Sequence, residues 1–190
     1  MDCLEAIFGR RSCRNFTSKP VEKEKITKIL ESAIYSPSAD NEQPWEFIVI
    51  NDPQYNKRLR EESEITKAKL AERSGWKWLG RFRIDFVEQA PVLIVVVGDP
   101  SKNGAEQFMD EPAAAYRYGC CAAIQNMMLA AHSLGLATVW FSIYEKSDVR
   151  AMLDIPAEKD PLAIICLGYP GKIGAAPARQ GLEQKVRFIG

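Results

Sequence analysis

The sequence lacks the features that would identify a membrane, zinc-binding or disulfide-rich protein. It contains no apolar run close to the roughly 20 residues that a membrane-spanning helix needs. Its first residues, Met1 to Glu5, are acidic where a secretory signal is basic. One histidine, His132, and 5 cysteines without a C-x-x-C pair argue against zinc sites and disulfide frameworks. We therefore expect a cytoplasmic protein with no metal ion and no membrane association.

An excess charge of one sign is also missing, because 25 Lys and Arg residues balance 25 Asp and Glu residues. A neutral chain has no overall field to attract nucleic acid, so we do not expect nucleic acid as a partner. The length of 190 residues fits a single domain, 1–190, with a substantial core. The adjacent Cys120 and Cys121 are either a redox couple or buried thiols. Because neighbouring side chains on a helix point about 100° apart, the spacing favours buried thiols.

The pattern of apolar residues predicts alternating helices and strands. Helical spacing predicts four helices, over residues 4–8, 22–35, 112–134 and 148–153. Apolar and β-branched runs predict four strands, over residues 46–50, 91–98, 137–143 and 162–169. The charged stretch 54–89 predicts two helical pieces with a bend at its glycines. The tail from about 170 to 190 has too few large apolar residues to pack on itself, so we expect it to wrap over a neighbouring subunit.

Two short polar segments stand out from this background. The first, Arg10-Arg11-Ser12-Cys13-Arg14, follows the first predicted helix and places three guanidinium groups and a hydroxyl within five residues. Each guanidinium group can donate two parallel hydrogen bonds to phosphate oxygens, and the hydroxyl can donate one further hydrogen bond. The segment is therefore suited to binding a phosphate without a metal ion. By itself, an arginine cluster is also typical of a solvated surface or an ion-pair site.

The second polar segment connects the helix over 22–35 to the strand over 46–50. Its sequence is Pro37-Ser38-Ala39-Asp40-Asn41-Glu42-Gln43-Pro44-Trp45. This polar loop is suited to lying against a flat ring. Asn41 either contacts a ligand or caps its own turn through a hydrogen bond from side chain to backbone. Trp45 enters a strand, so we expect it in the core.

With these segments the chain resembles the nitroreductase family of FMN enzymes over nearly its whole length. The arginine and serine cluster, the P-S-x-x-N-x-Q-P-W run, residues 125–136 and the late Gly168-Tyr169-Pro170 with Arg179 occur in the family's order. The resemblance implies an α+β fold in which helices flank a mixed, mainly antiparallel sheet. It also implies an intertwined homodimer with exchanged terminal segments and FMN at the interface.

The resemblance also implies roles for individual residues. Arg10, Ser12 and Arg179 would hold the phosphate and ribityl region, and Arg11 would contribute mainly through its backbone. Arg14 would reach the pyrimidine edge of the ring, where a fixed cation stabilises the negative charge of the reduced flavin. The partner subunit would contribute four residues of the second segment, Pro37, Ser38, Ala39 and Asn41.

The run Trp140-Phe141-Ser142 departs from the family pattern. Many relatives have a glycine after the third strand, which lets the backbone approach the flavin N5 closely. Trp140, Phe141 and Ser142 occupy that place here and are candidate contacts of the cofactor. We expect Ser142 to supply a donor from its side chain or its amide.

The implied activity is hydride transfer from NADH or NADPH, through bound FMN, to a small acceptor such as a nitroaromatic or a quinone. Since the flavin carries this chemistry, no catalytic side chain is expected, and we interpret His132 as a packing residue. Four aromatic residues are candidates for the substrate side: Trp76, Trp78, Phe82 and Phe108. Trp76 and Trp78 are equally suited to packing the segment that carries them.

Two other functions fit the same residues. A specialised member of the family, such as a reductive dehalogenase or a flavin-fragmenting synthase, would use residues 54–89 as a substrate-specific lid. A flavin-binding protein without turnover would act as a sensor or a store. The absorption spectrum of the purified protein and its response to NADH or NADPH separate these functions.

Overall fold

A computed structural model describes residues 1–110 and 113–190, so the predicted helix start at Pro112 lies outside the described residues. Four strands form one sheet in the order β1-β2-β4-β3, and every neighbouring pair in that sheet is antiparallel. The strands are β1 (Trp45–Ile50), β2 (Val92–Gly98), β3 (Ala137–Phe141) and β4 (Asp160–Gly168). The predicted α+β class and the four strands are confirmed. Parallel pairing, expected for a mixed sheet, is limited in the described chain to an isolated bridge between Ser12 and Thr138.

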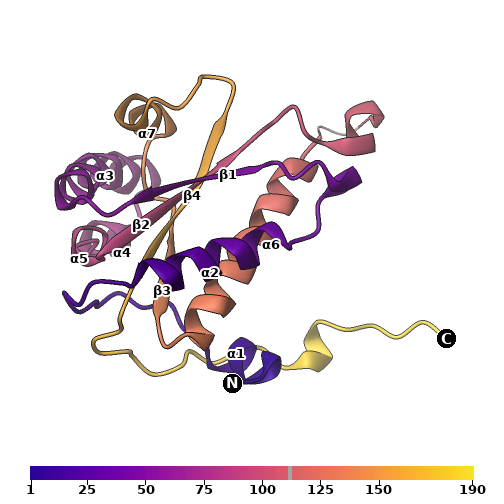
Figure 1. The fold of residues 1–190 in the computed structure, drawn as a ribbon, viewed down its shortest axis with the longest axis horizontal. Helices are drawn as coiled ribbons and strands as arrows, with labels where there is room; N and C mark the ends of the chain where they lie inside the picture. Colours follow the sequence, from indigo (N-terminus) through magenta and orange to yellow (C-terminus); the bar gives the residue numbers. More distant parts are fainter. Residues whose placement is uncertain (111–112) are drawn as a thin grey trace.

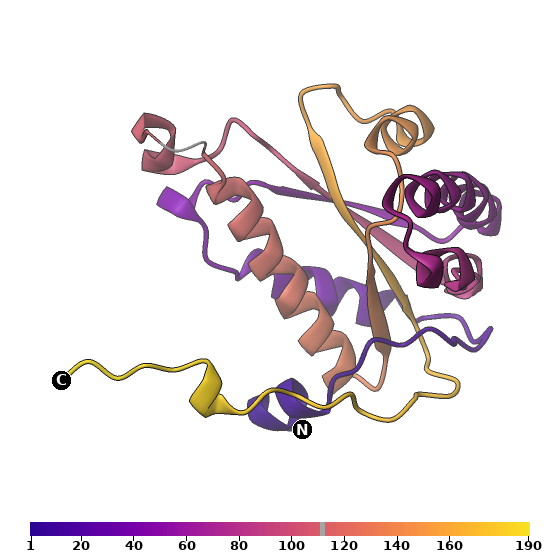
Figure 2. The same ribbon diagram turned by 180° about the vertical axis from the view of Figure 1, so that it is seen from behind.

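Seven α-helices lie within the described residues and cover both faces of the sheet (Figure 1). They are α1 (Cys3–Gly9), α2 (Lys23–Ile34), α3 (Pro53–Ser74), α4 (Lys77–Arg81), α5 (Phe86–Gln89), α6 (Ala115–Ser133) and α7 (Lys146–Leu153). Three short 3-10 helices are η1 (Ala39–Asn41), η2 (Gly104–Phe108) and η3 (Leu182–Gln184). Helices α2 and α6 cover one face, and α3, α4, α5 and α7 lie on the other (Figure 2).

The stretch 54–89 contains three helices rather than the two that the sequence predicts. Gly75 adopts a left-handed conformation with φ of 68°, and its N–H donates to the Ala71 carbonyl, which ends α3 after 22 residues. A second break at Phe82 separates α4 from α5. The bend at Gly75 is therefore as expected, and the additional break isolates the short helix α4.

The sheet divides the core into two clusters because strand side chains alternate between its faces. On β2, Leu93, Val95 and Val97 pack toward α3, α5 and α7. Their neighbours Val92, Ile94 and Val96 pack toward α2 and α6. All seven β2 residues are buried, which confirms the prediction that this strand is buried on both faces.

Helix α6 is the main element on its face and explains the apolar pattern of residues 115–133. Side chains around most of its circumference are buried, among them Cys120, Ile124 and Met127, each fully shielded from solvent. It packs along α2 and against the sheet (Figure 1). None of the described helices combines the length and the low polarity required to cross a bilayer.

We predict that Gly168→Ala destabilises the fold. A Cβ at this β4 position would lie 2.6 Å from Pro91 Cδ and 3.1 Å from a Phe16 ring carbon, and the proline ring cannot rotate away. Overpacking of this kind costs about 1–3 kcal/mol of unfolding free energy. Urea denaturation followed by circular dichroism measures the loss. The control is Gly80→Ala, whose Cβ meets nothing within 4 Å; equal stability of the two variants would contradict the packing argument.

Candidate functional site

The segment that carries the arginine cluster is held in an extended form between β3 and the start of the tail. Cys13 N–H donates to the Thr138 carbonyl at 2.9 Å, which attaches the segment to β3. At its other end Thr17 N–H donates to the Tyr169 carbonyl at 3.0 Å. The Asn15 carbonyl accepts from the Gly171 N–H at 2.8 Å, so the same segment also fixes the first residues of the tail.

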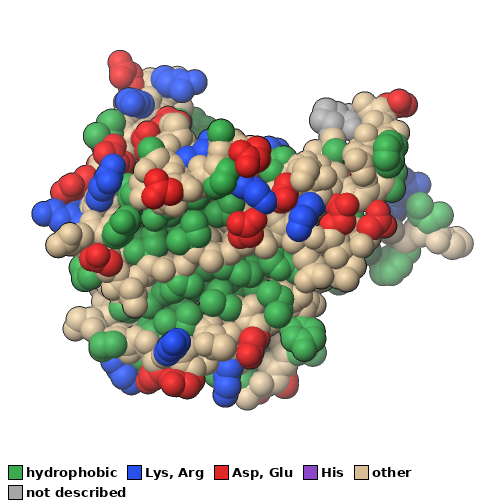
Figure 3. Space-filling view, turned by 45° about the horizontal axis from the view of Figure 1, so that its top comes forward, with side chains coloured by type: hydrophobic (Ala, Val, Ile, Leu, Met, Phe, Trp, Pro, Cys, Tyr) green, Lys and Arg blue, Asp and Glu red, His purple; other side chains and the backbone are tan. Residues whose placement is uncertain are grey.

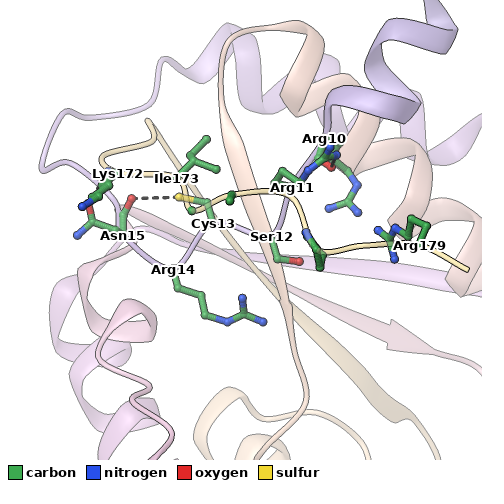
Figure 4. A pocket seen from close by; sticks show the side chains of 12 residues that line it. Arg10, Arg11, Ser12, Cys13, Arg14, Asn15, Lys172, Ile173 and Arg179 are labelled. Atoms are coloured by element: carbon green, nitrogen blue, oxygen red, sulfur yellow. Dashed lines mark hydrogen bonds between the residues drawn. The ribbon is translucent and has the colours of Figure 1, made fainter.

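This arrangement forms a cavity of about 460 Å³ between residues 10–15 and residues 172–179. Arg10, Arg11, Ser12 and Arg14 line it from one side and Arg179 from the other (Figure 4). In Figure 4 the side chains of Arg10 and Arg179 lie toward one end of the pocket, and that of Arg14 toward the opposite end. The structure thus brings together five of the predicted site residues from opposite ends of the chain. We call this cavity the arginine pocket.

The arginine pocket concentrates positive charge. Burial lowers the pKa of Arg10, and the nearby guanidinium groups of Arg11 and Arg179 lower it further. Within the described residues no carboxylate lies within ion-pair distance of Arg10, Arg14 or Arg179. Mutual repulsion without a counter-ion from the described chain makes the pocket a receptor for an anion.

Arg11 and His132 have structural roles at the edge of the arginine pocket. The Arg11 guanidinium donates to the carbonyls of Phe8 and Arg10 at 2.6 and 2.8 Å, which caps the end of α1. Its side chain is therefore engaged locally, in keeping with an expected contribution through the backbone. Burial lowers the pKa of His132, and the neighbouring charges of Arg10 and Arg11 lower it further, so the imidazole is neutral at pH 7.

Arg14 lies at the junction between the arginine pocket and a second cavity. Its guanidinium lies over the Phe82 ring, 5.6 Å from the centroid. The second cavity, of about 450 Å³, shares Arg14 and Asn15 with the arginine pocket and is also lined by Phe82 and Phe86. We call it the Phe82 cavity. A molecule that extends from the phosphate-binding end past Arg14 would therefore meet an aromatic wall.

The second polar segment forms a tight loop with an unusual backbone. Three non-glycine residues, Asp40, Asn41 and Gln43, have φ of 48°, 54° and 48°. Such left-handed conformations are costly for residues with a Cβ and cluster at functional sites. Ser38 Oγ accepts from Gln43 N–H at 3.0 Å, which stabilises the loop. The sequence did not signal these conformations, because Asp and Asn also occur in ordinary turns.

The Asn41 side chain is available to a ligand. It is exposed, and its amide group makes no hydrogen bond to any described residue. The sequence left open whether Asn41 contacts a ligand or caps its own turn. The described contacts contain no hydrogen bond from its side chain to the backbone of the turn. Pro37 is also exposed, while Ser38 and Ala39 are partly buried and line a cavity of about 310 Å³ beside Gly119.

The two polar segments lie at opposite ends of α6. A Cβ on Gly119, near the start of the helix, would touch Pro44 and Ser38. Near the end of the helix, the Cβ of a residue at Gly9 would touch His132. At 1.5 Å per residue these two contacts are about 20 Å apart along the helix axis. Moreover, Arg14 faces the α4 side of the sheet, so the loop and the arginine pocket of one chain do not form a common site.

The run at the end of β3 is only partly available to a ligand. The Phe141 ring is buried and packs edge-on against Phe86, with centroids 5.8 Å apart. Trp140 packs against the core on the α6 side of the sheet. Ser142 is exposed. A contact from these three residues would therefore come from the Ser142 side chain or from the backbone, because the Phe141 ring is occupied in the core.

The remaining candidates fall into separate regions. Trp76, Trp78 and Phe82 form a row of aromatic contacts next to Arg14, whereas Phe108 lies in η2, beside the loop of η1. Cys120 and Cys121 are both thiols. Burial raises the pKa of Cys120 to about 12 and also raises that of Cys121. Protonated thiols are poor nucleophiles, and Cys120 is buried while Cys121 is partly buried, which favours packing thiols over a redox couple.

Two sequence relatives cover almost the whole chain. A putative NADH dehydrogenase/NAD(P)H nitroreductase of Methanothermobacter thermautotrophicus is 35% identical over 176 residues, which is 90% of this chain and 79% of the relative. The 5,6-dimethylbenzimidazole synthase of Rhodospirillum rubrum is 29% identical over 196 residues, covering 98% of this chain and 95% of the synthase.

Solved structures resemble the chain over a similar extent. A BluB-like flavoprotein of Clostridium difficile 630 superposes with a TM-score of 0.82 at 26% identity and covers 100% of both chains. An FMN-dependent nitroreductase of Clostridium difficile R20291 superposes with a TM-score of 0.73 at 25% identity, covering 97% of this chain and 98% of the other. The sequence model of the nitroreductase family matches residues 7–169, from α1 to the end of the sheet. The chain therefore belongs to the nitroreductase family.

Proposed function

We propose that the protein is an FMN-dependent oxidoreductase that transfers hydride from NADH or NADPH to a small acceptor, such as a nitroaromatic or a quinone. The observation that carries the proposal is the arginine pocket, which Arg10, Arg14 and Arg179 line without a described carboxylate partner. Membership in the nitroreductase family and the flavin named for related structures support FMN as the anion.

The residues of the arginine pocket fit a phosphate monoester. Arg10, Ser12 and Arg179 supply donors from two segments, and hydrogen bonds to charged groups are worth about 1.5–3 kcal/mol each. The lowered pKa of His132 disfavours a positive charge on its imidazole, so the arginines are the cations offered to the phosphate. Arg11 caps the C-terminal end of α1 through its bond to the Phe8 carbonyl, and this holds the backbone of residues 10–14 in place.

When bound, FMN supplies the hydride chemistry. The protein contributes position and charge. Arg14 lies at the opposite end of the pocket from Arg10 and Arg179, and with the phosphate bound at their end it would face the pyrimidine edge of the ring and stabilise negative charge there. The Phe82 ring holds the Arg14 guanidinium from behind, so that this cation is oriented before the ligand binds. Ser142, exposed at the end of β3, is the candidate donor toward the ring.

We further propose that a complete site needs two copies of this chain. The loop of Pro37, Ser38, Ala39 and Asn41 lies about one α6 length away from the arginine pocket of its own chain. In a homodimer with a twofold axis, the loop of one copy would complete the pocket of the other. The exposed, unpartnered Asn41 side chain and the left-handed backbone around it would then serve a ligand in the partner.

The exposed apolar surface supports such a dimer. Large apolar side chains are solvent-exposed on α1, α2 and the tail, namely Leu4, Phe8, Ile34, Tyr35, Leu182, Phe188 and Ile189. Figure 3 shows hydrophobic side chains gathered across the face that carries β1 and α2. Exposed apolar side chains gathered in this way favour burial against another surface, and a second copy of the chain would supply one.

The tail supplies a specific contact for the partner. From Gly171 on, nearly every tail residue is exposed, and beyond η3 the tail projects from the body of its own chain (Figure 2). Val186 and Phe188 alternate with Lys185 and Arg187, a period of two that suits a strand. Among the described strands none pairs with the outer edge of β1, and Asp52 and Asp154 lie by its end. We therefore propose a single domain, 1–190, whose tail (170–190) covers the partner.

The phosphate assignment predicts that Arg10→Ala and Arg179→Ala each weaken FMN binding about 10- to 100-fold, because each removes a charge-assisted hydrogen bond. Fluorescence titration of the apoprotein with FMN measures the effect. Arg73→Ala, an exposed arginine of α3, is the matched control and should retain the affinity of the unmodified protein. Unchanged flavin content in a variant that combines Arg10→Ala with Arg179→Ala would refute the assignment.

The reductase proposal predicts that NADH or NADPH bleaches the flavin absorption of the purified protein under anaerobic conditions. A nitroaromatic such as 4-nitrobenzoate, or a quinone, should then restore the oxidised spectrum. Bleaching without reoxidation by either class would favour a specialised member of the family, such as a reductive dehalogenase or a flavin-fragmenting synthase. A flavin that neither nucleotide reduces would favour the binding protein.

The dimer proposal predicts that Phe188→Asp weakens association at least about 10-fold, because burial of a phenylalanine contributes about 1.5–3 kcal/mol. Sedimentation velocity across a dilution series measures the monomer fraction. Gln184→Asp introduces the same charge at an exposed polar position of the tail and is the control. A monomer that keeps its FMN would contradict the shared site.

A further inference from the structure

Two tryptophans on the outside of α4 have an arrangement that their packing does not explain. Trp76 and Trp78 stack with ring centroids 5.8 Å apart and planes inclined by 29°. Their side chains nevertheless remain 58% and 56% exposed. Tryptophans that only fill the core lose most of their exposure, whereas here more than half of each indole faces solvent. The pair therefore presents a rigid aromatic surface rather than a core contact.

The tryptophan pair is connected to the proposed cofactor site by direct contacts. Trp78 packs edge-on against Phe82, with centroids 6.0 Å apart. Phe82 lines the Phe82 cavity and carries Arg14 over its ring. Since the Phe82 cavity and the arginine pocket share Arg14 and Asn15, the row from Trp76 to Arg14 runs from the molecular surface to the proposed flavin ring.

The row is held in place from below. Leu79, on the inner side of α4, is buried. Lys67 of α3 donates from Nζ to the Phe82 carbonyl at 2.9 Å and is also paired with Glu64. These contacts fix both the helix and the residue that ends it. The aromatic surface is thus preorganised, which reduces the entropy that a ligand must overcome on binding.

The charge around the row is positive. Lys77, Arg81 and Arg83 are exposed at or next to α4, and Asp85 pairs with Arg83. Within the described chain no carboxylate lies within ion-pair distance of Lys77 or Arg81. Arg81 follows Trp78 by three residues on α4, a spacing that places two side chains next to each other on a helix, so a ligand that stacks on Trp78 lies near an uncompensated cation. An anionic substituent on the ligand would be favoured over a neutral one.

We propose that Trp76, Trp78 and Phe82 form the binding site for the acceptor, and that this site selects planar aromatic rings that carry an anionic group such as a carboxylate. The proposal rests on the proposed function, because the acceptor must reach the flavin that the arginine pocket holds. It assigns substrate specificity to α4. The aromatic faces bind the ring, and Lys77 and Arg81 bias binding toward the anion.

The test uses benzoate, which has the ring and the charge but no nitro group. Isothermal titration of the FMN-loaded protein should show that Trp78→Ala weakens benzoate binding about 3- to 10-fold, the range of one lost aromatic contact. Trp78→Phe should restore most of the affinity, and Ile65→Ala, an exposed apolar residue of α3, should change nothing. Cyclohexanecarboxylate keeps the charge but has no aromatic ring, and benzyl alcohol keeps the aromatic ring but has no charge. Both should bind more weakly than benzoate.

Two further measurements separate the acceptor site from other roles. In steady-state reduction of 4-nitrobenzoate, Trp78→Ala should raise KM about as much as it weakens benzoate binding, while FMN affinity and the dimer are unchanged. Unaltered benzoate affinity in the Trp76→Ala and Trp78→Ala variants would overturn the proposal. So would dissociation of the dimer, since the pair would then be a subunit contact. A protein that takes up no FMN would refute the proposed function. The same benzoate titration, repeated on the flavin-free protein and its Trp78→Ala variant, would then still decide whether the tryptophans bind the ring, because it needs no turnover.

Discussion

The site depends on how residues 12–17 are attached to the rest of the fold. A single backbone hydrogen bond joins Cys13 to Thr138 of β3, and two others join Thr17 and Asn15 to the chain that leaves β4. Through these bonds the sheet fixes the position of an extended segment that has no regular structure of its own. The arginines on that segment can repel one another and still stay in place, because the backbone that carries them is bonded on both sides.

The sheet makes this attachment rigid because its central strands are buried on both faces. β2 and β4 separate two apolar clusters, and nearly all of their residues are shielded from solvent. Polar function is therefore confined to the margins: the edge strand β3, the loops at the two ends of α6, and the helices α4 and α5. Helix α6 determines how far apart two of these margins are, and its length is what separates the loop of Asn41 from the arginine pocket.

The arginine pocket and α4 both carry positive charge, but they would select different ligands, first the cofactor and then the acceptor. In the proposals above, the pocket binds a phosphate through its guanidinium groups, whereas α4 offers exposed aromatic faces with cationic residues on the same helix. Arg14 belongs to both, since it lines the pocket and stacks on Phe82. A cation shared in this way would couple the redox properties of the flavin to the occupancy of the acceptor site, which follows from the proposals above.

The sequence alone determined the four strands, the burial of β2, the bend at Gly75 and the identity of the two polar segments, because these follow from local spacing and residue type. It also determined the family through the order of its motifs. Only the tertiary structure decided that Arg179 joins residues 10–14, that the Asn41 loop lies at the other end of α6, and that the Phe141 ring belongs to the core. These depend on contacts between residues far apart in the chain, and periodicity carries no information about which distant segments meet.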